Sequence, residues 1–371
     1  MELSLIIPTY NRASLLYKVL ESILRQTLSA EHFEVIVVDN GSTDTTLNVV
    51  NSFKSRLINL RYFIEHCPGL HAGRHKGCIE AQSNLLVYAD DDIEAFPTWL
   101  QAIKDTFDDK DVVMVGGKCL PRFELDPPEW LQAMWSSKPP GNQILGYLSL
   151  IDLGDVAKPV DPSHVYGCNF AIRRSVLLEA GGFHPDSMPQ ELIRFRGDGE
   201  SYVSEFVQTK GYKAYYNPLA SIYHWVPTGR MTIEYFCRRA YNQGISDSYT
   251  AIRFAKGINL GTIVTESVQD SRWRLLEKMF TVVKGFVSRM SKELALDLIG
   301  QGALARKELV LRRELAAAYQ KGYSCHQGLV RESPELLAWV LKTDYWNCRL
   351  PSLGNDEFNL NDSNRLTARQ W

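Results

Sequence analysis

Three consecutive acidic side chains are the feature of this sequence that most directly suggests chemistry. Asp90, Asp91 and Asp92 follow the apolar run Leu85–Ala89, which has the length and composition of a buried strand. Neighbouring carboxylates repel one another unless a cation or hydrogen-bond donors offset their charge. Alternate residues of an extended chain point the same way, so Asp90 and Asp92 can reach one ligand while Asp91 points elsewhere. The spacing fits a divalent cation shared with a diphosphate; a solvated acidic turn or helix cap is the alternative.

The acids belong to a chain that alternates apolar runs with helical patterns over its first hundred residues. We predict strands at residues 3–7, 34–38, 60–64 and 85–89, and helices at residues 13–26 and 74–82, with a further helix after Ser42 or Thr43. Such alternation predicts an α/β fold with a mostly parallel sheet flanked by helices. Ligands of these sheets bind beyond the carboxyl ends of the strands, where Pro8–Arg12, Asp39–Asn40 and the three acids stand.

The second half of the chain has a different character. After about residue 112 the alternation loosens into a stretch rich in proline and loops, and after Arg230 the composition becomes helical. At 371 residues the chain exceeds what one core usually holds. We therefore predict two domains, a mixed α/β domain at residues 1–245 and a mainly helical region at residues 246–371.

Composition and charge exclude several classes of protein. The hydrophobic fraction of 45% and the charged fraction of 23% are ordinary for a globular protein and argue against a disordered or membrane-embedded chain. Forty-one basic and 43 acidic residues give a formal net charge of −2, which offers no support for nucleic-acid binding. Seven cysteines without a C-x-x-C pair favour reduced thiols over a disulfide framework or a zinc site.

The sequence shows no signal for export or for crossing a membrane. It begins with strand-forming residues and lacks the roughly 18 consecutive apolar residues that a spanning helix needs, so we expect a cytoplasmic protein. Residues 272–292 form a basic amphipathic pattern. Such a helix can lie against the inner face of a membrane or pack on its own domain, and the second interpretation is favoured.

Three blocks of the sequence together resemble the family 2 glycosyltransferases. They are Leu-Ile-Ile-Pro-Thr-Tyr-Asn-Arg at residues 5–12, Val-Val-Asp-Asn-Gly-Ser-Thr-Asp at residues 37–44 and the acids at residues 90–92. Their order and spacing match, and the similarity extends from about Leu3 to Arg230. The resemblance implies the GT-A fold and an inverting transfer of a sugar from a nucleotide-diphosphate sugar to an acceptor hydroxyl.

The resemblance also implies a nucleotide-sugar site. Carried over to matching positions, it comprises Pro8, Tyr10, Asn11, Asp39, Arg74, Asp90, Asp91, Asn169 and Arg230. Asp39 would accept hydrogen bonds from the base or ribose, and Arg230 would bind the diphosphate from a loop. Arg74 matches the family arginine that contacts the nucleotide, whereas Gly73 and His75 depart from the usual alanine and asparagine.

A metal site and a general base are implied as well. Asp92, His224 and Asp90 would hold Mn²⁺ or Mg²⁺ beside the diphosphate. An inverting transfer needs a carboxylate to take the proton of the acceptor hydroxyl. In Arg-Gly-Asp-Gly-Glu-Ser at residues 196–201, Glu200 falls where the family has its catalytic aspartate. We therefore predict Glu200 as the base, with Asp198 as the alternative, and expect one of the two to cap the following helix.

The substrates are less well defined by these motifs. A UDP-linked hexose is the favoured donor, with GDP- and dTDP-sugars as alternatives. The acceptor, a carbohydrate, a lipid-linked sugar or a small molecule in polysaccharide or glycoconjugate synthesis, would lie against Leu120–Gly167 and the C-terminal helices. Trp130 and Trp135 in that stretch can stack on a sugar or pack internally. Homo-oligomerisation is a further hypothesis.

Two other functions compete with this interpretation. A sugar nucleotidyltransferase would carry a glycine-rich phosphate loop after the first strand, and residues 8–13 contain no glycine. A non-catalytic carbohydrate-binding protein on the same fold is the second alternative, because the acidic segment 198–200 departs from the family pattern.

Overall fold

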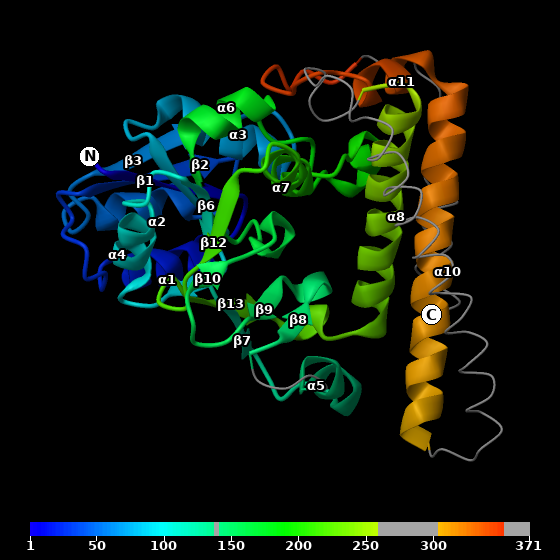
Figure 1. Cartoon of the computed structure of the whole chain (residues 1–371), viewed down its shortest axis with the longest axis horizontal. Coiled ribbons are helices and arrows are strands. Elements are labelled where there is room, and N and C mark those ends of the chain that lie inside the picture. Colours follow the sequence, from blue (N-terminus) through cyan, green and yellow to red (C-terminus); the bar gives the residue numbers. More distant parts are fainter. Residues whose placement is uncertain (137–140, 259–302, 352–371) are drawn as a thin grey trace.

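The chain folds into a mixed α/β part followed by long helices, as Figure 1 shows. The computed structural model describes residues 1–136, 141–258 and 303–351. In this described part an eight-stranded sheet has the order β10-β12-β6-β11-β4-β1-β2-β3. Its strands are β1 (Leu3–Thr9), β2 (Phe33–Asp39), β3 (Leu60–Ile64), β4 (Leu85–Ala89), β6 (Val112–Gly116), β10 (Lys158–Pro159), β11 (Asn169–Arg173) and β12 (Lys213–Tyr216).

Most pairings within this sheet are parallel. β1 pairs in parallel with β2 and β4, β2 with β3, and β6 with β12, whereas β11 runs antiparallel to β4 and β6. The edge strand β10 is antiparallel to β12. The predicted mostly parallel sheet is confirmed. Thr9 pairs with Asp39, so the carboxyl ends of β1 and β2 lie level at one edge.

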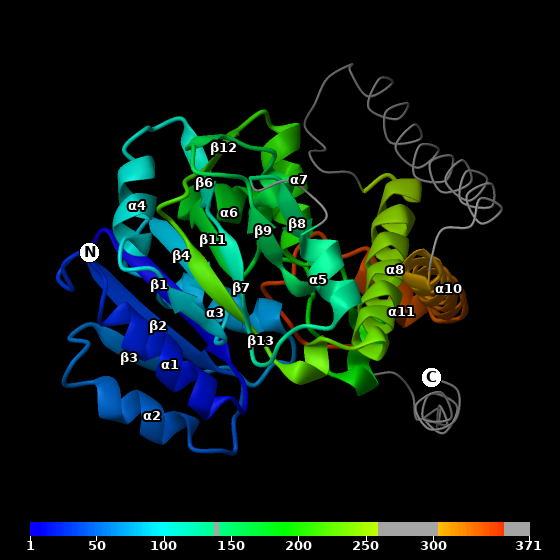
Figure 2. The ribbon, with the colours of Figure 1, turned by 90° about the horizontal axis from the view of Figure 1, so that it is seen from below.

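Helices cover both faces of the sheet (Figure 2). They are α1 (Ala13–Ile23), α2 (Thr46–Phe53), α3 (Leu70–Glu80), α4 (Trp99–Thr106), α6 (Arg174–Ala180) and α7 (Glu200–Thr209). On β1, Leu5 and Ile7 pack with α1, α2 and α4, while Ile6 faces the opposite side with α3, α6 and α7. Gly77 lets α3 approach closely, because a Cβ there would lie 2.2 Å from Ile6 Cγ2.

A second sheet carries part of the site. Its order is β5-β13-β7-β9-β8. The strands are β5 (Ile93–Ala95), β7 (Cys119–Phe123), β8 (Gln143–Leu145), β9 (Leu150–Asp152) and β13 (Ile222–Val226), and α5 (Glu129–Ser136) lies between β7 and β8. β13 pairs with β5 with His224 opposite Ile93, which brings His224 beside the acidic triplet. Trp130 and Trp135 join an apolar cluster around Phe236, so internal packing is the role the structure gives them.

The helical region consists of α8 (Ile233–Ala255), α10 (Ala303–Glu332) and α11 (Pro334–Val340). α8 and α10 lie side by side (Figures 1 and 2). They approach closely at Gly244 and Gly322, where a Cβ would lie 2.1 Å and 2.0 Å from a backbone oxygen of the opposite helix. The predicted boundary at residue 245 falls inside α8, which begins after Thr232 caps its first turn. The division into domains stays a prediction.

The membrane-surface hypothesis concerns residues 272–292, which lie outside the described residues. Among the described helices, none is long and apolar enough to cross a membrane.

The prediction that the cysteines are all reduced thiols is wrong. Cys67 and Cys348 form a disulfide with a Cα–Cα distance of 6.1 Å, and the other five cysteines are free. The two partners are 281 residues apart in sequence. Cysteine spacing in a sequence predicts pairs only where the two cysteines are close together in the chain. Cys67 and Cys348 become neighbours only in the folded protein.

Candidate active site

A cleft of about 640 Å³ opens at the carboxyl ends of β1 and β4. Six predicted site residues line it, namely Pro8, Tyr10, Asp90, Asp91, Asp92 and Arg230. Its other lining residues are Thr9, Arg12, Asn40, His66, Pro68, Gly69, Leu70, Ser187, Pro189 and Glu191. The Tyr10 side chain is 57% exposed and stands free at the opening. The strand ends therefore bring most of the predicted polar residues together.

Asp91 is held by its neighbours on the adjacent strand end. Its Oδ2 accepts a hydrogen bond of 2.7 Å from the Thr9 hydroxyl, and its Oδ1 lies 2.9 Å from Arg12 Nη1. Burial raises the pKa of Asp91 above its usual value, and the Arg12 guanidinium opposes that rise. Both oxygens are thus bonded within the protein, and Asp91 also lines the cleft, so its role in nucleotide-sugar binding stays a prediction.

Asp90, Asp92 and His224 form a candidate metal site. Their ligand atoms all lie within 4.8 Å of one another. His224 Nδ1 donates to the Leu148 carbonyl at 2.8 Å, so its Nε2 faces Asp92 Oδ1 at 3.1 Å. Asp90 Oδ1 is buried without a hydrogen-bond partner and lies 3.5 Å from Arg74 Nη2. Two carboxylates and an imidazole are suitable ligands for a divalent cation, and the Asp90 Oδ1 atom has no hydrogen-bond partner that would compete with it.

Cationic side chains surround Asp92. Arg230 Nη2 lies 2.9 Å and Arg12 Nη1 3.2 Å from its Oδ2. Against the effect of burial, His224, Arg230 and Arg12 hold the pKa of Asp92 well below its usual range. Burial lowers the pKa of His224, but Asp92 outweighs this and raises it to about 9. Arg12 was expected at this sheet edge from its place in the block at residues 5–12, but its pairing with Asp91 and Asp92 was not predicted.

Arg74 was predicted to contact the nucleotide, and the structure places it behind the cleft. It is buried, and its Nη1 donates to Glu200 Oε2 at 3.2 Å while its Nη2 donates to the Gly167 carbonyl at 3.1 Å. A Cβ on Gly167 would lie 2.4 Å from Arg74 Nη2 and 2.7 Å from Glu200 Oε1. A larger residue at position 167 would therefore displace the Arg74 or Glu200 side chain. Through Arg74, the cleft residue Asp90 is connected to Glu200.

The two candidate bases have different environments. Asp198 Oδ1 accepts a 2.6 Å bond from His184 Nδ1, and its Oδ2 accepts a 2.7 Å bond from the Thr250 hydroxyl. Burial alone would raise the pKa of Asp198, but His184 and Thr250 lower it below its usual value. Glu200 begins α7 and its side chain is 28% exposed. The residue at the helix cap is Gly199, so the expectation that one acid caps the helix is wrong.

Three other predicted binders lie outside the cleft lining. The Asp39 carboxylate accepts from the Ser42 amide at 2.7 Å and from the Tyr62 hydroxyl at 2.6 Å. Asn11 accepts from the amide of Thr43 at 2.7 Å and organises the turn after β2. These side chains shape the loops beside the cleft, and Asn40, next to Asp39, is the residue that reaches it.

Asn169 likewise has an internal role. Its Oδ1 accepts a 2.8 Å bond from Trp99 Nε1, and its Nδ2 donates to the Ala220 carbonyl at 2.9 Å. It therefore ties β11 to α4 and to the segment that precedes β13. The segment at residues 187–191, which lines the opposite wall of the cleft, had no sequence signal that pointed to it.

Comparison with known proteins shows what the N-terminal half of the chain resembles. Residues 4–181 match the profile described as glycosyl transferase family 2. Validoxylamine A glucosyltransferase of Streptomyces hygroscopicus subsp. jinggangensis is 42% identical over 103 residues, which are 27% of this chain and 24% of that protein. Glucosyl-dolichyl phosphate glucuronosyltransferase of Haloferax volcanii is 23% identical over 253 residues, 66% of this chain and 76% of that protein. The chain thus spans about a quarter of the length of the Streptomyces relative.

The fold has a counterpart among solved structures. The mannosyltransferase PcManGT from Pyrobaculum calidifontis, in complex with GDP-Man and Mn²⁺, superposes with a TM-score of 0.52 at 20% identity, covering 86% of each chain. This likeness confirms the GT-A fold. The family profile ends before the acidic segment at residues 198–200 and before His224, so their roles depend on the geometry described above. Residues 4–181, just under half of the chain, are thus similar to glycosyl transferase family 2, and the chain has the GT-A fold.

Proposed function

We propose that this protein transfers a sugar from a nucleotide-diphosphate sugar to an acceptor hydroxyl, with inversion at the anomeric carbon. One observation carries the proposal. Asp90 and Asp92 line the cleft, with His224 beside them as the third candidate ligand, and Arg74 connects Asp90 to the partly exposed carboxylate of Glu200. A donor-binding wall and a candidate base are thus joined in one site.

Donor binding uses residues that already face the cleft. The exposed ring of Tyr10 offers an apolar face to a nucleoside base. Arg230 stands on the short helix η4 (Thr228–Arg230) at the cleft, from where it can pair with a diphosphate. Asp90, Asp92 and His224 would hold the cation, Mn²⁺ or Mg²⁺. A divalent cation bound there would offset the negative charge that develops on the leaving diphosphate.

Glu200 is proposed as the general base. Arg74 donates to its Oε2 and so orients the carboxylate. Within the described residues, Oε1 accepts no hydrogen bond, which leaves it free to take the proton of an acceptor hydroxyl. Asp198, with both oxygens occupied, is proposed to support the start of α7 through His184 and Thr250.

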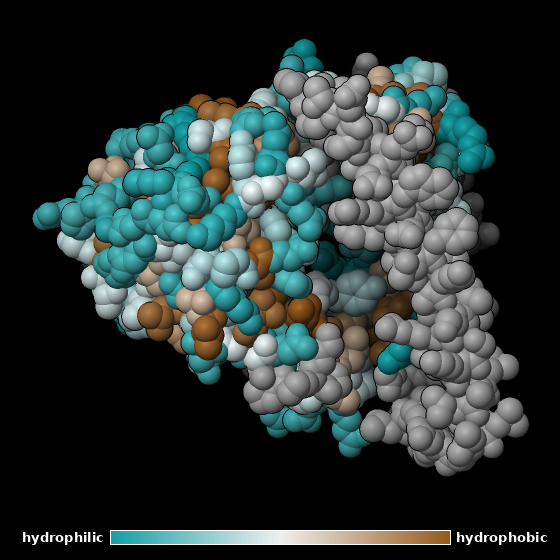
Figure 3. Space-filling view, viewed as in Figure 1, coloured by the Kyte–Doolittle hydropathy of each residue, from teal (hydrophilic) through white to brown (hydrophobic). Residues whose placement is uncertain are grey.

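The identity of the substrates is a separate proposal. The relatives are named for glucosyl and glucuronosyl transfer, which supports a hexose-type sugar, and we propose a UDP-sugar as donor. We propose that the acceptor is a carbohydrate, a lipid-linked sugar or a small molecule and lies near residues 120–167. Hydrophobic side chains gather on the surface over β7, β8 and β9 in that stretch (Figure 3), which supports a binding role for this face.

A panel of nucleotide sugars, with and without Mn²⁺ or Mg²⁺, tests the proposal. Thermal shift is measured first, and release of the nucleoside diphosphate with candidate acceptors is measured next. A donor at 100 times its Kd should stabilise the protein by about 2.7 kcal/mol. Asp92→Asn should remove the metal-dependent part of that shift, whereas Asp105→Asn, at an exposed position on α4, serves as control.

Two results would contradict parts of the proposal. If turnover persists both in the presence of a chelator and in Asp92→Asn, the assignment of the metal site is wrong. Donor binding without nucleotide release for any acceptor tested would favour the non-catalytic carbohydrate-binding alternative.

A further inference from the structure

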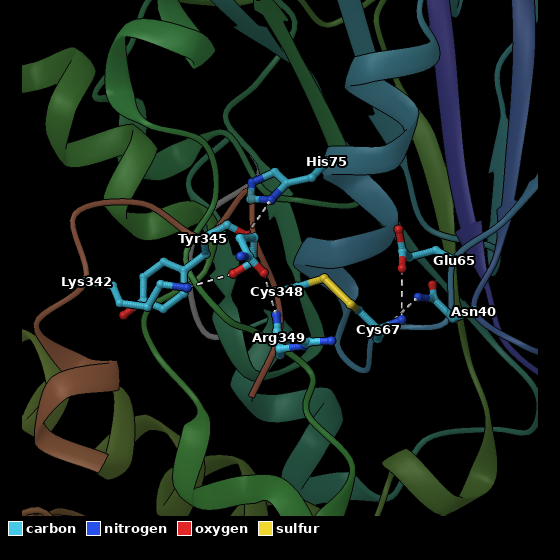
Figure 4. The surroundings of a disulfide bond; sticks show 9 residues. Asn40, Glu65, Cys67, His75, Lys342, Tyr345, Cys348 and Arg349 are labelled. Atoms are coloured by element: carbon cyan, nitrogen blue, oxygen red, sulfur yellow. Dashed lines mark hydrogen bonds between the residues drawn. A yellow bond between two sulfur atoms is a disulfide. The ribbon is translucent and has the colours of Figure 1, made fainter. Parts of the chain in front are cut away.

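The C-terminal end of the described chain returns to the wall of the cleft. We call residues 341–351 the C-terminal strap. Its Cys348 is joined to Cys67 by the disulfide, as Figure 4 shows. The neighbours of Cys67 on either side, His66 and Pro68, both line the cleft. The strap is therefore covalently attached to the wall against which the donor is proposed to bind.

Among the residues that the structure describes, few hydrogen bonds hold this wall besides the disulfide. The Cys67 amide donates to Glu65 Oε1 at 2.9 Å, and its carbonyl accepts from Asn40 Nδ2 at 3.2 Å. Gly69 then enters α3 with a φ of 101°, a conformation that favours glycine. Residues 66–69 belong to no helix or strand, so their position relies on these bonds and on the disulfide.

The strap also packs on α3 itself. Trp346 stacks on His75 with ring centroids 4.1 Å apart. His75 Nε2 accepts from the Phe183 amide at 2.8 Å, so Nδ1 carries the proton and donates to the Tyr345 carbonyl at 3.2 Å. His75 is buried and directly follows Arg74, the side chain that orients Glu200.

Its other end is anchored to α8. The Tyr345 hydroxyl bonds the Tyr249 hydroxyl at 2.7 Å and donates to the Trp339 carbonyl at 2.7 Å. Arg253 Nη1 donates to the carbonyls of Val340 and Lys342 at 2.7 Å and 2.6 Å. The strap thus links α8, α3 and the cleft wall in one continuous path.

We infer that the C-terminal strap is part of the donor site and that the Cys67–Cys348 disulfide makes nucleotide binding dependent on redox state. A dithiol reduces the bond by two electrons, giving two cysteine thiols and one oxidised dithiol. The strap then remains held by Tyr345 and Trp346, but residues 66–69 lose their covalent restraint. The inference rests on the proposed function only in naming the ligand as a nucleotide.

The test compares the oxidised full chain with the same chain after dithiothreitol treatment. The number of titratable thiols should rise by two. Amide exchange in residues 66–76 should become about tenfold faster, while exchange in β1 stays unchanged. The Kd for UDP with Mn²⁺ should weaken about tenfold, which corresponds to about 1.4 kcal/mol. In transfer assays, KM for the donor should rise with kcat nearly constant.

Cysteine variants provide the matched controls. Cys67→Ser and Cys348→Ser should each behave as the reduced protein and should not respond to the dithiol. Cys325→Ser removes an exposed free thiol on α10, so the thiol count should be one lower in both redox states. The rise by two on reduction and the other three measurements should match those of the natural chain. If the first two variants fail to fold, reduction and reoxidation of the natural chain give the same comparison.

Three outcomes decide the matter. Unchanged exchange in residues 66–76 after two thiols have appeared would overturn the inference. So would a thiol titration showing Cys67 and Cys348 reduced from the start. If amide exchange becomes faster but UDP binds in neither redox state, the disulfide does restrain residues 66–69. The proposal that UDP carries the donor sugar would then be refuted instead.

Discussion

Separate substitutions at residues 198 and 200 test which acid is the general base, proposed to be Glu200, and which has the structural role proposed for Asp198. Glu200→Gln keeps the length of the side chain and an oxygen for Arg74 Nη1 but removes the basic group. We expect kcat to fall by about 10²–10⁴. Because one hydrogen bond from the buried Arg74 becomes a bond to a neutral acceptor, the free energy of unfolding should fall by about 1–1.5 kcal/mol.

Asp198→Asn should affect stability instead. Its carboxylate accepts bonds of 2.6 Å and 2.7 Å from His184 and Thr250. Hydrogen bonds to a charged group contribute about 1.5–3 kcal/mol and neutral ones about 0.5–1.5 kcal/mol, so converting both costs about 2–3 kcal/mol. Each kcal/mol lowers Tm by about 2–4 °C in a domain of this size. kcat should fall less than about tenfold.

The pH dependence of stability gives an independent check on Asp198. Its folded-state pKa lies below the ordinary value of 3.8, so the unfolded chain takes up protons first as the pH falls. The stability it contributes is present above that ordinary value and is lost as the pH falls through the folded-state pKa. The difference in stability between the natural chain and Asp198→Asn should therefore narrow below about pH 4.

The assay is nucleotide release at saturating donor, with Tm measured by circular dichroism on the same samples. Glu31→Gln, at an exposed position, is the control for loss of a glutamate charge. The assignment of the base would be refuted by normal turnover in Glu200→Gln together with inactive but fully stable Asp198→Asn.

Two further predictions concern stability. Burial lowers the pKa of three histidines to about 3, 3 and 4, and these are His71, His75 and His326. In the unfolded chain these histidines protonate near pH 6.5, so their contribution to the free energy of unfolding is present above that pH and is lost below it. The loss is about 2 kcal/mol for each histidine at pH 5. Urea unfolding at pH 7.5 and at pH 5.0 will measure it. Gly77→Ala should cost about 1–3 kcal/mol, because the new methyl group would lie 2.2 Å from Ile6 Cγ2. Gly328→Ala, with no atom within 4 Å of the new group in α10, should stabilise the protein by up to about 1 kcal/mol in the same urea assay, and equal effects of the two would contradict the packing of α3 on β1.

The strands at the cleft were predictable because their signals are local. β1, β2 and β4 are continuous apolar runs, as strands covered on both faces must be, and their polar ends meet at one edge. The second sheet was not predicted. Three of its strands, β5, β8 and β9, are three residues long, too short to show a period of two.

The contacts that fix the candidate base could not be derived from the sequence. Arg74 and Glu200 are separated by 126 residues, and Asp198 and Thr250 by 52. No periodicity relates such pairs. His75, which departs from the family pattern, is explained only once Tyr345 and Trp346 are seen to pack on it.

The acidic triplet shows why one half of the site was predictable and the other was not. β1 and β4 pair with Ile6 opposite Tyr88, and continuing that register places Thr9 opposite Asp91. The Thr9 hydroxyl and Arg12 hold Asp91, whereas Asp90 and Asp92, together with His224, are the candidate ligands of a cation. That arrangement follows from strand register. Glu200 stands at the start of a helix, so no strand register places it opposite another site residue. The acid proposed to take the proton is distinguished by the exposure of its side chain and by its Oε1 atom, which accepts no hydrogen bond within the described residues.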